Sequence, residues 1–559
     1  MGGSRLFVRL TSNHPAWRLG SLFLALLVMF PILSVLSIAL KPSGEIWAHL
    51  LDTSLRLYVK NSIALMIGVG TLVLLVGIVT AWLVTMCHFP GRKLFEWLLL
   101  FPLAIPTYVI AYAYTDLLEY SGLVQEFLRG LFGWQKEDYW FPEIRSTGGA
   151  IFVMGLVLYP YVYLLARSAF LEQSVNLLEA SQALGRGPWL TFFSVSLPGA
   201  RPAIVVGLAL VLMETLNDYG TVSFFSVPTL TAGLMDVWLG LGSLPAGAQI
   251  ASLMLLFATL LLFLEQISRG KRRYYQQLSS RFKALPNYKL IGIKRLLAIL
   301  ICCTPIGIGF IIPVLILCNL SIKYFTRSWT KDFQILAFNS LLISALAAIL
   351  CVALGLFITY SRRLNSGRVV GLTTRIASLG YAIPGAVLAI GILASFAALD
   401  NSLDKLMRNM FGFSTGLILS GTIAAVLFAY VVRFMMIAIG QIGSSLEKLP
   451  SSIDMAARTL GYTAGGTMIR FHIPLIRGGV LTAFTIVFVD CMKELPATLI
   501  LRPFGFETLA THVYHYASDE MLGEAALGAI LIVASGLLPV ILLSRLISLS
   551  RQSATKYSS

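Results

Sequence analysis

Long apolar runs separated by short polar segments make up most of the chain. A membrane-spanning helix needs roughly 20 consecutive and mainly apolar residues. About twelve runs in the 559-residue sequence reach this length, so we expect about twelve transmembrane helices. They are predicted at residues 17–40, 61–87, 94–116, 148–170, 201–224, 246–267, 297–320, 337–361, 372–398, 415–440, 477–499 and 522–547.

The composition indicates the same class of protein. Hydrophobic residues make up 57% of the chain and charged residues only 12%, whereas soluble domains carry about 25% charged residues. The first apolar run follows Arg5, Arg9 and Arg18 but is too long for the core of a signal peptide, so we expect it to stay as an anchor. Six cysteines lie within or at the ends of apolar runs and indicate neither a disulfide framework nor a CxxC metal site.

Basic residues predict how the chain is oriented. Residues 268–295 hold nine Lys or Arg and no acidic residue, and four Arg fill the connection between the eighth and ninth predicted spans. Because such residues collect on the cytoplasmic side of a membrane, both connections and both termini are predicted to be cytoplasmic. The net charge of +16 is then an orientation signal and an attraction to anionic membrane lipid, with no nucleic-acid partner expected.

The sequence also contains an internal duplication. The tripeptide Ala104-Ile105-Pro106 recurs as Ala382-Ile383-Pro384, and further pairs recur 276 positions apart, such as Pro198 with Pro474. Six spans, an even number, separate the copies, so they share one orientation and are related by a pseudo-twofold axis along the membrane normal. We therefore predict an all-α polytopic protein with a first six-helix repeat at 1–267, a basic cytoplasmic linker at 268–296 and a second repeat at 297–559.

Each repeat has an amphipathic cytoplasmic segment that is not apolar enough to cross the membrane. Small residues allow close contact with a partner, Gly ends the helix with a left-handed cap, and Pro starts the next element. An ordinary interfacial loop is the alternative to a docking helix, but the repetition of the spacing favours docking. The residues concerned are Glu179, Ala180 and Gly185 in the first copy and Asp454, Ala456, Ala457 and Gly461 in the second.

This spacing resembles the coupling (EAA) motif of ABC importer permeases of the type I, MetI-like kind. Two units in one chain, with the segments 213–220 and 493–503, look most like the ferric iron permeases of the FbpB group. The resemblance implies a bacterial inner-membrane protein that contacts two copies of a cytoplasmic ABC ATPase and a periplasmic ferric-binding protein. Met455 stands where the family usually has Glu, and Leu178 and Ser181 also depart from the pattern, so the two docking contacts are expected to differ.

The chain is not expected to be an enzyme or to bind a cofactor. It contains no GxxxxGK[ST] sequence, the phosphate-binding loop of many ATPases. ATP and Mg²⁺ are therefore expected on the partner ATPase, and the transported species is expected to be Fe³⁺.

Acidic residues inside the fifth and eleventh spans are the candidates for a translocation pathway or gate. Glu214 and Asp218 are four positions apart, as are Asp490 and Glu494, so each pair is predicted to share one helical face. With Lys493, four carboxylates give a formal charge of −3, which favours a cation, and hard oxygen ligands favour ferric iron. The alternative is a buried network that only locks the helices together. Asn217 is the counterpart of Lys493 in the first copy.

Other sites and functions remain open. His512 and His515 have the spacing of two ligands on one helix face, but two histidines are a weak metal signal, and a gating or docking segment is the alternative. Trp134, Tyr139 and Trp140 are typical of residues at a membrane interface. Alternative functions are import of thiamine or another small solute by the same fold, proton-coupled secondary transport, and a structural membrane scaffold.

Overall fold

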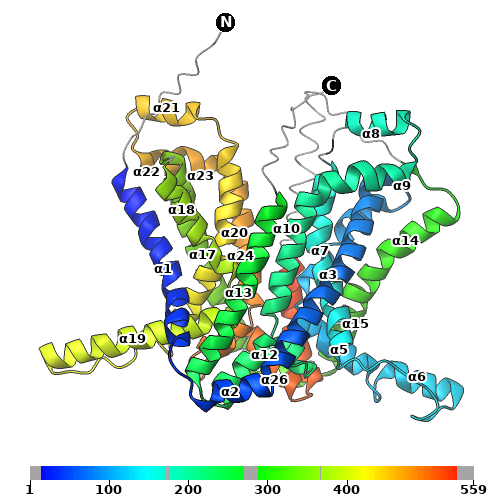
Figure 1. Cartoon of the computed structure of the whole chain (residues 1–559), viewed down its shortest axis with the longest axis horizontal. Coiled ribbons are helices and arrows are strands. Elements are labelled where there is room, and N and C mark those ends of the chain that lie inside the picture. Colours follow the sequence, from blue (N-terminus) through cyan, green and yellow to red (C-terminus); the bar gives the residue numbers. More distant parts are fainter. Residues whose placement is uncertain (1–13, 172, 174, 270–287, 366, 538–559) are drawn as a thin grey trace, which may run out of the picture.

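The computed structural model describes residues 14–171, 173, 175–269, 288–365 and 367–537 (Figure 1). Within this part of the chain, nine helices are long and apolar enough to span a membrane. They are α1 (Pro15–Ala39), α3 (Leu55–Met86), α7 (Thr147–Leu171), α9 to α10 (Pro188–Asn217), α13 (Leu244–Arg269), α14 to α15 (Ile293–Lys323), α17 (Lys331–Leu364), α19 (Gly385–Phe411) and α20 (Ile423–Glu447).

Two further apolar segments, at the third and eleventh predicted spans, are pairs of helices that meet at a bend. The first pair is Arg92–Ala104 and Thr107–Phe132, which meet at 90°. The second pair is Ala464–Leu475 and α24 (Arg477–Met492), which meet at 82°, and α24 begins where the eleventh predicted span begins. Pro106 explains the first bend, because the residue before a proline is pushed out of the helical region, and Ile105 is extended. Pro384 has the same effect in the second repeat, where α19 begins one residue later.

The twelfth predicted span is described only in part. Leu522–Leu537 forms a short apolar helix, while residues 538–547 of that prediction lie outside the described residues, as do residues 270–287 of the predicted linker. Nine helices, two bent pairs and this segment together account for the twelve predicted spans.

Shorter elements connect the spans. A two-stranded parallel pair joins β1 (Cys87–His88) to β2 (Tyr288–Lys289). The short helices are α2 (Glu45–Asp52), α4 (Arg92–Leu98), α5 (Thr107–Leu118), α6 (Leu123–Phe132), α8 (Val175–Ala183), α11 (Gly220–Phe224), α12 (Leu230–Met235), α16 (Phe325–Ser328), α18 (Arg368–Ala377), α21 (Ser452–Thr459), α22 (Ala464–Thr467), α23 (Ile473–Leu475), α25 (Pro496–Leu501) and α26 (Leu509–Ser518).

The two halves exchange their first helices. Helix α1 packs against α18 and α19 of the second half, and α14 and α15 contact α3 and α5 of the first, so each lies at an outer edge of the molecule (Figure 1). Hydrogen bonds fix both contacts: Ser361 Oγ donates to the Trp17 carbonyl at 2.9 Å, and the Tyr114 hydroxyl donates to the Ile308 carbonyl at 2.6 Å. The sequence repeats are therefore interlocked in space and not simply side by side.

Candidate functional site

The two predicted docking segments lie on one face of the molecule, as α8 and α21 (Figure 1). Gly185 and Gly461 follow these helices with φ of +76° and +81°, the left-handed conformation that glycine adopts without strain. Leu184 and Leu460, just before the glycines, have exposed fractions of 77% and 71%. The predicted short exposed helix with a sharp turn is thus confirmed in both copies.

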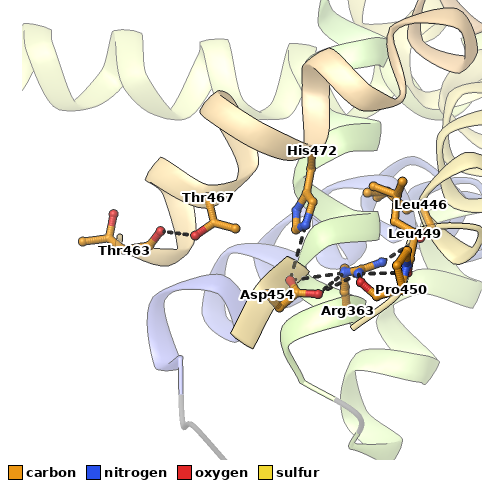
Figure 2. Close-up of polar contacts among 8 residues, drawn as sticks. All are labelled: Arg363, Leu446, Leu449, Pro450, Asp454, Thr463, Thr467 and His472. Atoms are coloured by element: carbon orange, nitrogen blue, oxygen red, sulfur yellow. Dashed lines mark hydrogen bonds and ion pairs between the residues drawn. The ribbon is translucent and has the colours of Figure 1, made fainter. Parts of the chain in front are cut away.

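A partly buried polar network holds α21 against the ends of α17 and α20 (Figure 2). The Arg363 guanidinium binds the Asp454 carboxylate at 2.6 Å and donates to the carbonyl of Leu446 at 2.6 Å and of Leu449 at 3.1 Å. The buried ring of His472 approaches the same carboxylate at 3.5 Å. Asp454 therefore points back into the protein and not outward to a partner.

The first copy has no such network at the equivalent positions. Leu178, which is buried, stands 276 positions before Asp454, and Ser196 stands 276 positions before His472. Thr85, 278 positions before Arg363, donates its hydroxyl to the carbonyl of its own helix at Ala81. At the position of Asp454, helix α8 therefore has the buried apolar side chain of Leu178, and α8 makes a polar contact elsewhere, between the hydroxyls of Ser181 and Thr191 at 3.0 Å. Leu178 was the sequence signal of this difference.

The predicted pathway acids gather around a cavity of about 100 Å³ between the two halves. Its volume is that of roughly three water molecules. Chain segments from both repeats line it, including the C-terminal ends of α10 and α24. Its polar lining residues include Thr107, Tyr161, Glu214, Asn217, Asp218, Tyr381, Arg433, Asp490, Lys493 and Glu494.

The prediction that each acidic pair shares one helical face is wrong. Helix α10 ends at Asn217 and α24 at Met492, so Asp218 and Glu494 lie beyond the helix ends. Asp218 instead accepts hydrogen bonds from the backbone N–H of Thr221 at 2.9 Å and from the Thr107 hydroxyl at 2.5 Å. Glu494 likewise accepts from the N–H of Ala497 at 3.2 Å. Each carboxylate therefore caps the short helix that follows it, α11 or α25.

Arg433 is a site residue that the sequence reasoning missed. Its buried guanidinium lies 3.3 Å from Glu494 and donates to the Asn217 amide oxygen at 3.0 Å, joining the two repeats. The same amide oxygen accepts from the N–H of Gly385 at 2.5 Å. One signal was present: an arginine inside an apolar run whose counterpart 276 positions earlier is Val157.

Two further pairs of polar groups line the cavity. Lys493 Nζ lies 2.8 Å from Asp490, and the Tyr381 hydroxyl donates to Glu214 at 3.1 Å. The lining contains four carboxylates and two cationic side chains, Lys493 and Arg433. The formal charge of the cavity is therefore −2 (four minus two), whereas the sequence predicted −3. It remains acidic.

His512 and His515 lie on α26, outside the spans. His512 packs against the rings of Phe333 and Tyr516, and burial together with the neighbouring His515 lowers its pKa to about 4. His515 contacts Arg502 at 3.0 Å. Among the described residues, no group of three His, Cys, Asp or Glu side chains is placed to hold a metal ion. The structure thus gives the two histidines packing and polar partners.

Two interlocked repeats of apolar helices, an exposed helix and glycine turn on one face of each, and a charged cavity between them define a multi-pass membrane permease. The family model for the inner-membrane component of binding-protein-dependent transport systems matches residues 73–269 and again 351–551. The chain therefore belongs to this MetI-like family, with two permease units fused in one polypeptide.

Characterised relatives fall into two groups. The chain is 25% identical to Fe(3+)-transport system permease protein FbpB 2 of Haemophilus influenzae, across 87% of this chain and 89% of the relative. It is 21% identical to the ferric transport system permease protein FbpB of Actinobacillus pleuropneumoniae, across 77% of this chain and 63% of the relative. The molybdenum transport system permease protein ModB of Escherichia coli is 30% identical, but across only 35% of this chain.

Proposed function

We propose that this chain is the permease subunit of an ABC importer that moves ferric iron across the bacterial inner membrane by ATP-driven alternating access. The observation that carries the proposal is the similarity to a ferric permease along 87% of the chain, covering both repeats. Relatives named for molybdenum and sulfate match about a third of the chain, which is the length of one unit.

The charge of the cavity supports a cationic substrate. Its formal charge of −2 would repel molybdate or sulfate and attract a cation. Hard cations prefer oxygen ligands such as carboxylates. Glu214 and Asp490 supply carboxylate oxygens along the lining, and Tyr161 supplies a phenol oxygen. Thiamine, which is also cationic, is the nearest competing substrate.

The connectivity of the helices suggests how a conformational change in the ATPase would be transmitted to the cavity. Helix α8 leads through α9 into α10, which ends at Asn217, and α21 leads through α22 and α23 into α24, which ends one residue before Lys493. In the proposed importer, two copies of an ATPase subunit dock on α8 and α21 from the cytoplasm, and a periplasmic binding protein delivers substrate to the opposite face. Closure of the ATPase pair would then displace both helix ends that line the cavity.

Locking and gating are compatible roles for the same polar groups. Arg433 bridges Asn217 of one repeat and Glu494 of the other, so the halves cannot separate without breaking this contact. A closed state with these contacts intact and an open state without them would give the two conformations that alternating access requires.

The experiment measures both ATP hydrolysis and iron uptake by the permease, reconstituted in liposomes with its ATPase and a ferric-loaded binding protein. We expect ferric loading to stimulate hydrolysis, and the double variant Glu214→Gln with Asp490→Asn to lose iron uptake. Asp332→Asn, which removes an exposed carboxylate that does not line the cavity, is the matched control. Unchanged iron uptake in the double variant would contradict a role of these acidic residues in the pathway. Uptake driven by a proton gradient without ATP would contradict the assignment to ABC importers.

A further inference from the structure

Two arms project sideways from the molecule on the face opposite α8 and α21 (Figure 1). One is α6 (Leu123–Phe132), and the other is the C-terminal part of α19, from residue 399 to Phe411. Both end in a left-handed glycine, Gly133 with φ of +68° and Gly412 with φ of +75°. The glycines are 279 positions apart, so the arms are repeat counterparts.

Each arm carries an exposed apolar stripe at helical spacing. In the α19 arm Leu399, Leu403, Leu406 and Met410 follow the i, i+4, i+7, i+11 pattern of one face of a helix. The counterparts in the first arm, each 279 positions earlier, are Val124, Phe127 and Leu131. The counterpart of Leu399 is Tyr120, which precedes α6 and whose ring lies 4.1 Å from the Arg129 guanidinium. Phe127 and Leu131 have exposed fractions of 69% and 63%, and Leu406 and Met410 of 50% and 65%.

The polar face of each arm is already occupied by the chain that returns from its tip. Arg129 donates to the Tyr139 hydroxyl at 3.3 Å, which donates to the Gln125 amide at 2.7 Å. In the other arm Arg408 donates to the Ser414 hydroxyl at 2.9 Å, which donates to the Asp404 carboxylate at 2.6 Å.

The helix residues in these two sets of contacts occupy equivalent positions of the two repeats. Gln125 is the counterpart of Asp404, and Arg129 is the counterpart of Arg408, each 279 positions earlier. Both arms thus bind their return segment with the polar face and leave the apolar face uncovered. Within the described part of the chain, Phe127, Leu131, Leu406 and Met410 are each half exposed or more.

We propose that the two arms are interfacial helices whose apolar stripes lie in the outer leaflet of the membrane. An amphipathic helix of this kind lies in the plane of the interface with its apolar face roughly 5–10 Å deep in the boundary between headgroups and acyl chains. Helix α19 supports this occupant, because it is one continuous helix that leaves the apolar bundle and becomes the arm. Aromatic residues near the tips, Phe132 stacked on Trp134 and Phe411 beside Phe413, are typical of the same zone.

Anchored arms would hold the far ends of two helices that begin at the cavity. Helix α5, which precedes the first arm, begins at Thr107, a hydrogen-bond donor to Asp218. Helix α19 begins at Gly385, a donor to Asn217. The leaflet would therefore provide a fixed reference against which the cavity ends of α10 and α24 move.

The test is spin-label accessibility in the full complex in lipid nanodiscs. Single cysteines replace Phe127 or Leu406 on the stripes, in a background where the accessible Cys303 and Cys318 are changed to Ser. Glu126→Cys and Lys405→Cys are matched controls, since these exposed residues also occupy equivalent positions, one residue before each stripe position. The readout is collision of each label with oxygen, which partitions into lipid, and with a water-soluble nickel complex.

We expect the ratio of oxygen to nickel collisions to be severalfold higher at positions 127 and 406 than at positions 126 and 405. Equal ratios at stripe and control positions would overturn the proposal. Stripe labels that are open to nickel alone and become shielded only when the loaded binding protein is added would also overturn it, in favour of a protein-docking surface.

Discussion

The charged attachment of α21 makes α8 and α21 unequal, and removing this attachment should loosen α21 alone. The variant Arg363→Ala leaves the Asp454 carboxylate and the carbonyls of Leu446 and Leu449 without their donor. Both charged side chains are less than a fifth exposed, at 17% and 19%. Hydrogen bonds to charged groups contribute about 1.5–3 kcal/mol, and a fully buried pair costs about 3–5 kcal/mol when one partner is removed. With this partial exposure we expect a loss of about 2–4 kcal/mol in the local stability of α21.

Hydrogen exchange of backbone amides, followed by mass spectrometry, measures this loss. Since each 1.4 kcal/mol is a factor of ten, amides of α21 should exchange roughly 30-fold to 1,000-fold faster in the variant, while those of α8 keep their rate. Thr85→Ala, at the equivalent position of the first copy, is the control and should leave both helices unchanged. Unchanged exchange in α21, or equal acceleration in α8 and α21, would show that the contact between Arg363 and Asp454 does not stabilise α21 specifically.

A double variant tests whether the pair acts as a unit. Arg363→Thr with Asp454→Leu installs the residues of the first copy at both positions. We expect the double variant to be less destabilised than the sum of the two single variants, because neither charge is then left buried alone. Additive losses would show that the two side chains act independently.

Three further predictions concern single glycines and one histidine, with thermal unfolding in detergent as the common measurement. Gly461→Ala should lower the unfolding temperature, because a side chain in the left-handed region costs about 1–2 kcal/mol; an unchanged temperature would contradict the role of the turn. Gly385→Ala should also destabilise, by on the order of 1–3 kcal/mol, because the added Cβ would lie 2.5 Å from Arg433 Nη1. The control for both is Gly440→Ala, where a Cβ meets no atom within 4 Å. The pKa of His512 falls from 6.5 to about 4 in the folded chain, so the unfolded chain binds the proton first and stability should fall as pH drops from about 6.5 to 4. His512→Phe should remove this part of the pH dependence, and an identical pH profile in the variant would argue against a buried neutral ring.

The sequence predicted the repeated features well and the unrepeated ones poorly. Duplication identified both glycine turns, because the same spacing occurring twice outweighs the ambiguity of a short amphipathic segment. The first copy has Val157 in place of Arg433, so a search for features that occur in both repeats did not identify this arginine. The attachment of Asp454 to Arg363 joins segments that are 91 positions apart, which no local pattern encodes.

Helix ends were the second source of error. A period of 3.6 residues continues through Asn217 and Asp218 in the sequence, so the pairs of acids looked helical. The carboxylates of Asp218 and Glu494 bind the N–H groups of the following helix instead, and such capping competes with continued helix in a way that apolar periodicity does not show.

Uptake of iron by the reconstituted complex tests the central claim most directly. Liposomes containing the permease and its ATPase are supplied with ATP inside and with binding protein loaded with radioactive ferric iron outside, and parallel samples receive molybdate, sulfate or thiamine with matching binding proteins. We expect ATP-dependent accumulation of ferric iron that exceeds that of the other three solutes and stops when ATP is omitted. Accumulation of an anion or of thiamine in preference to iron would contradict the proposed substrate, and iron uptake that persists without ATP would contradict the proposed mechanism.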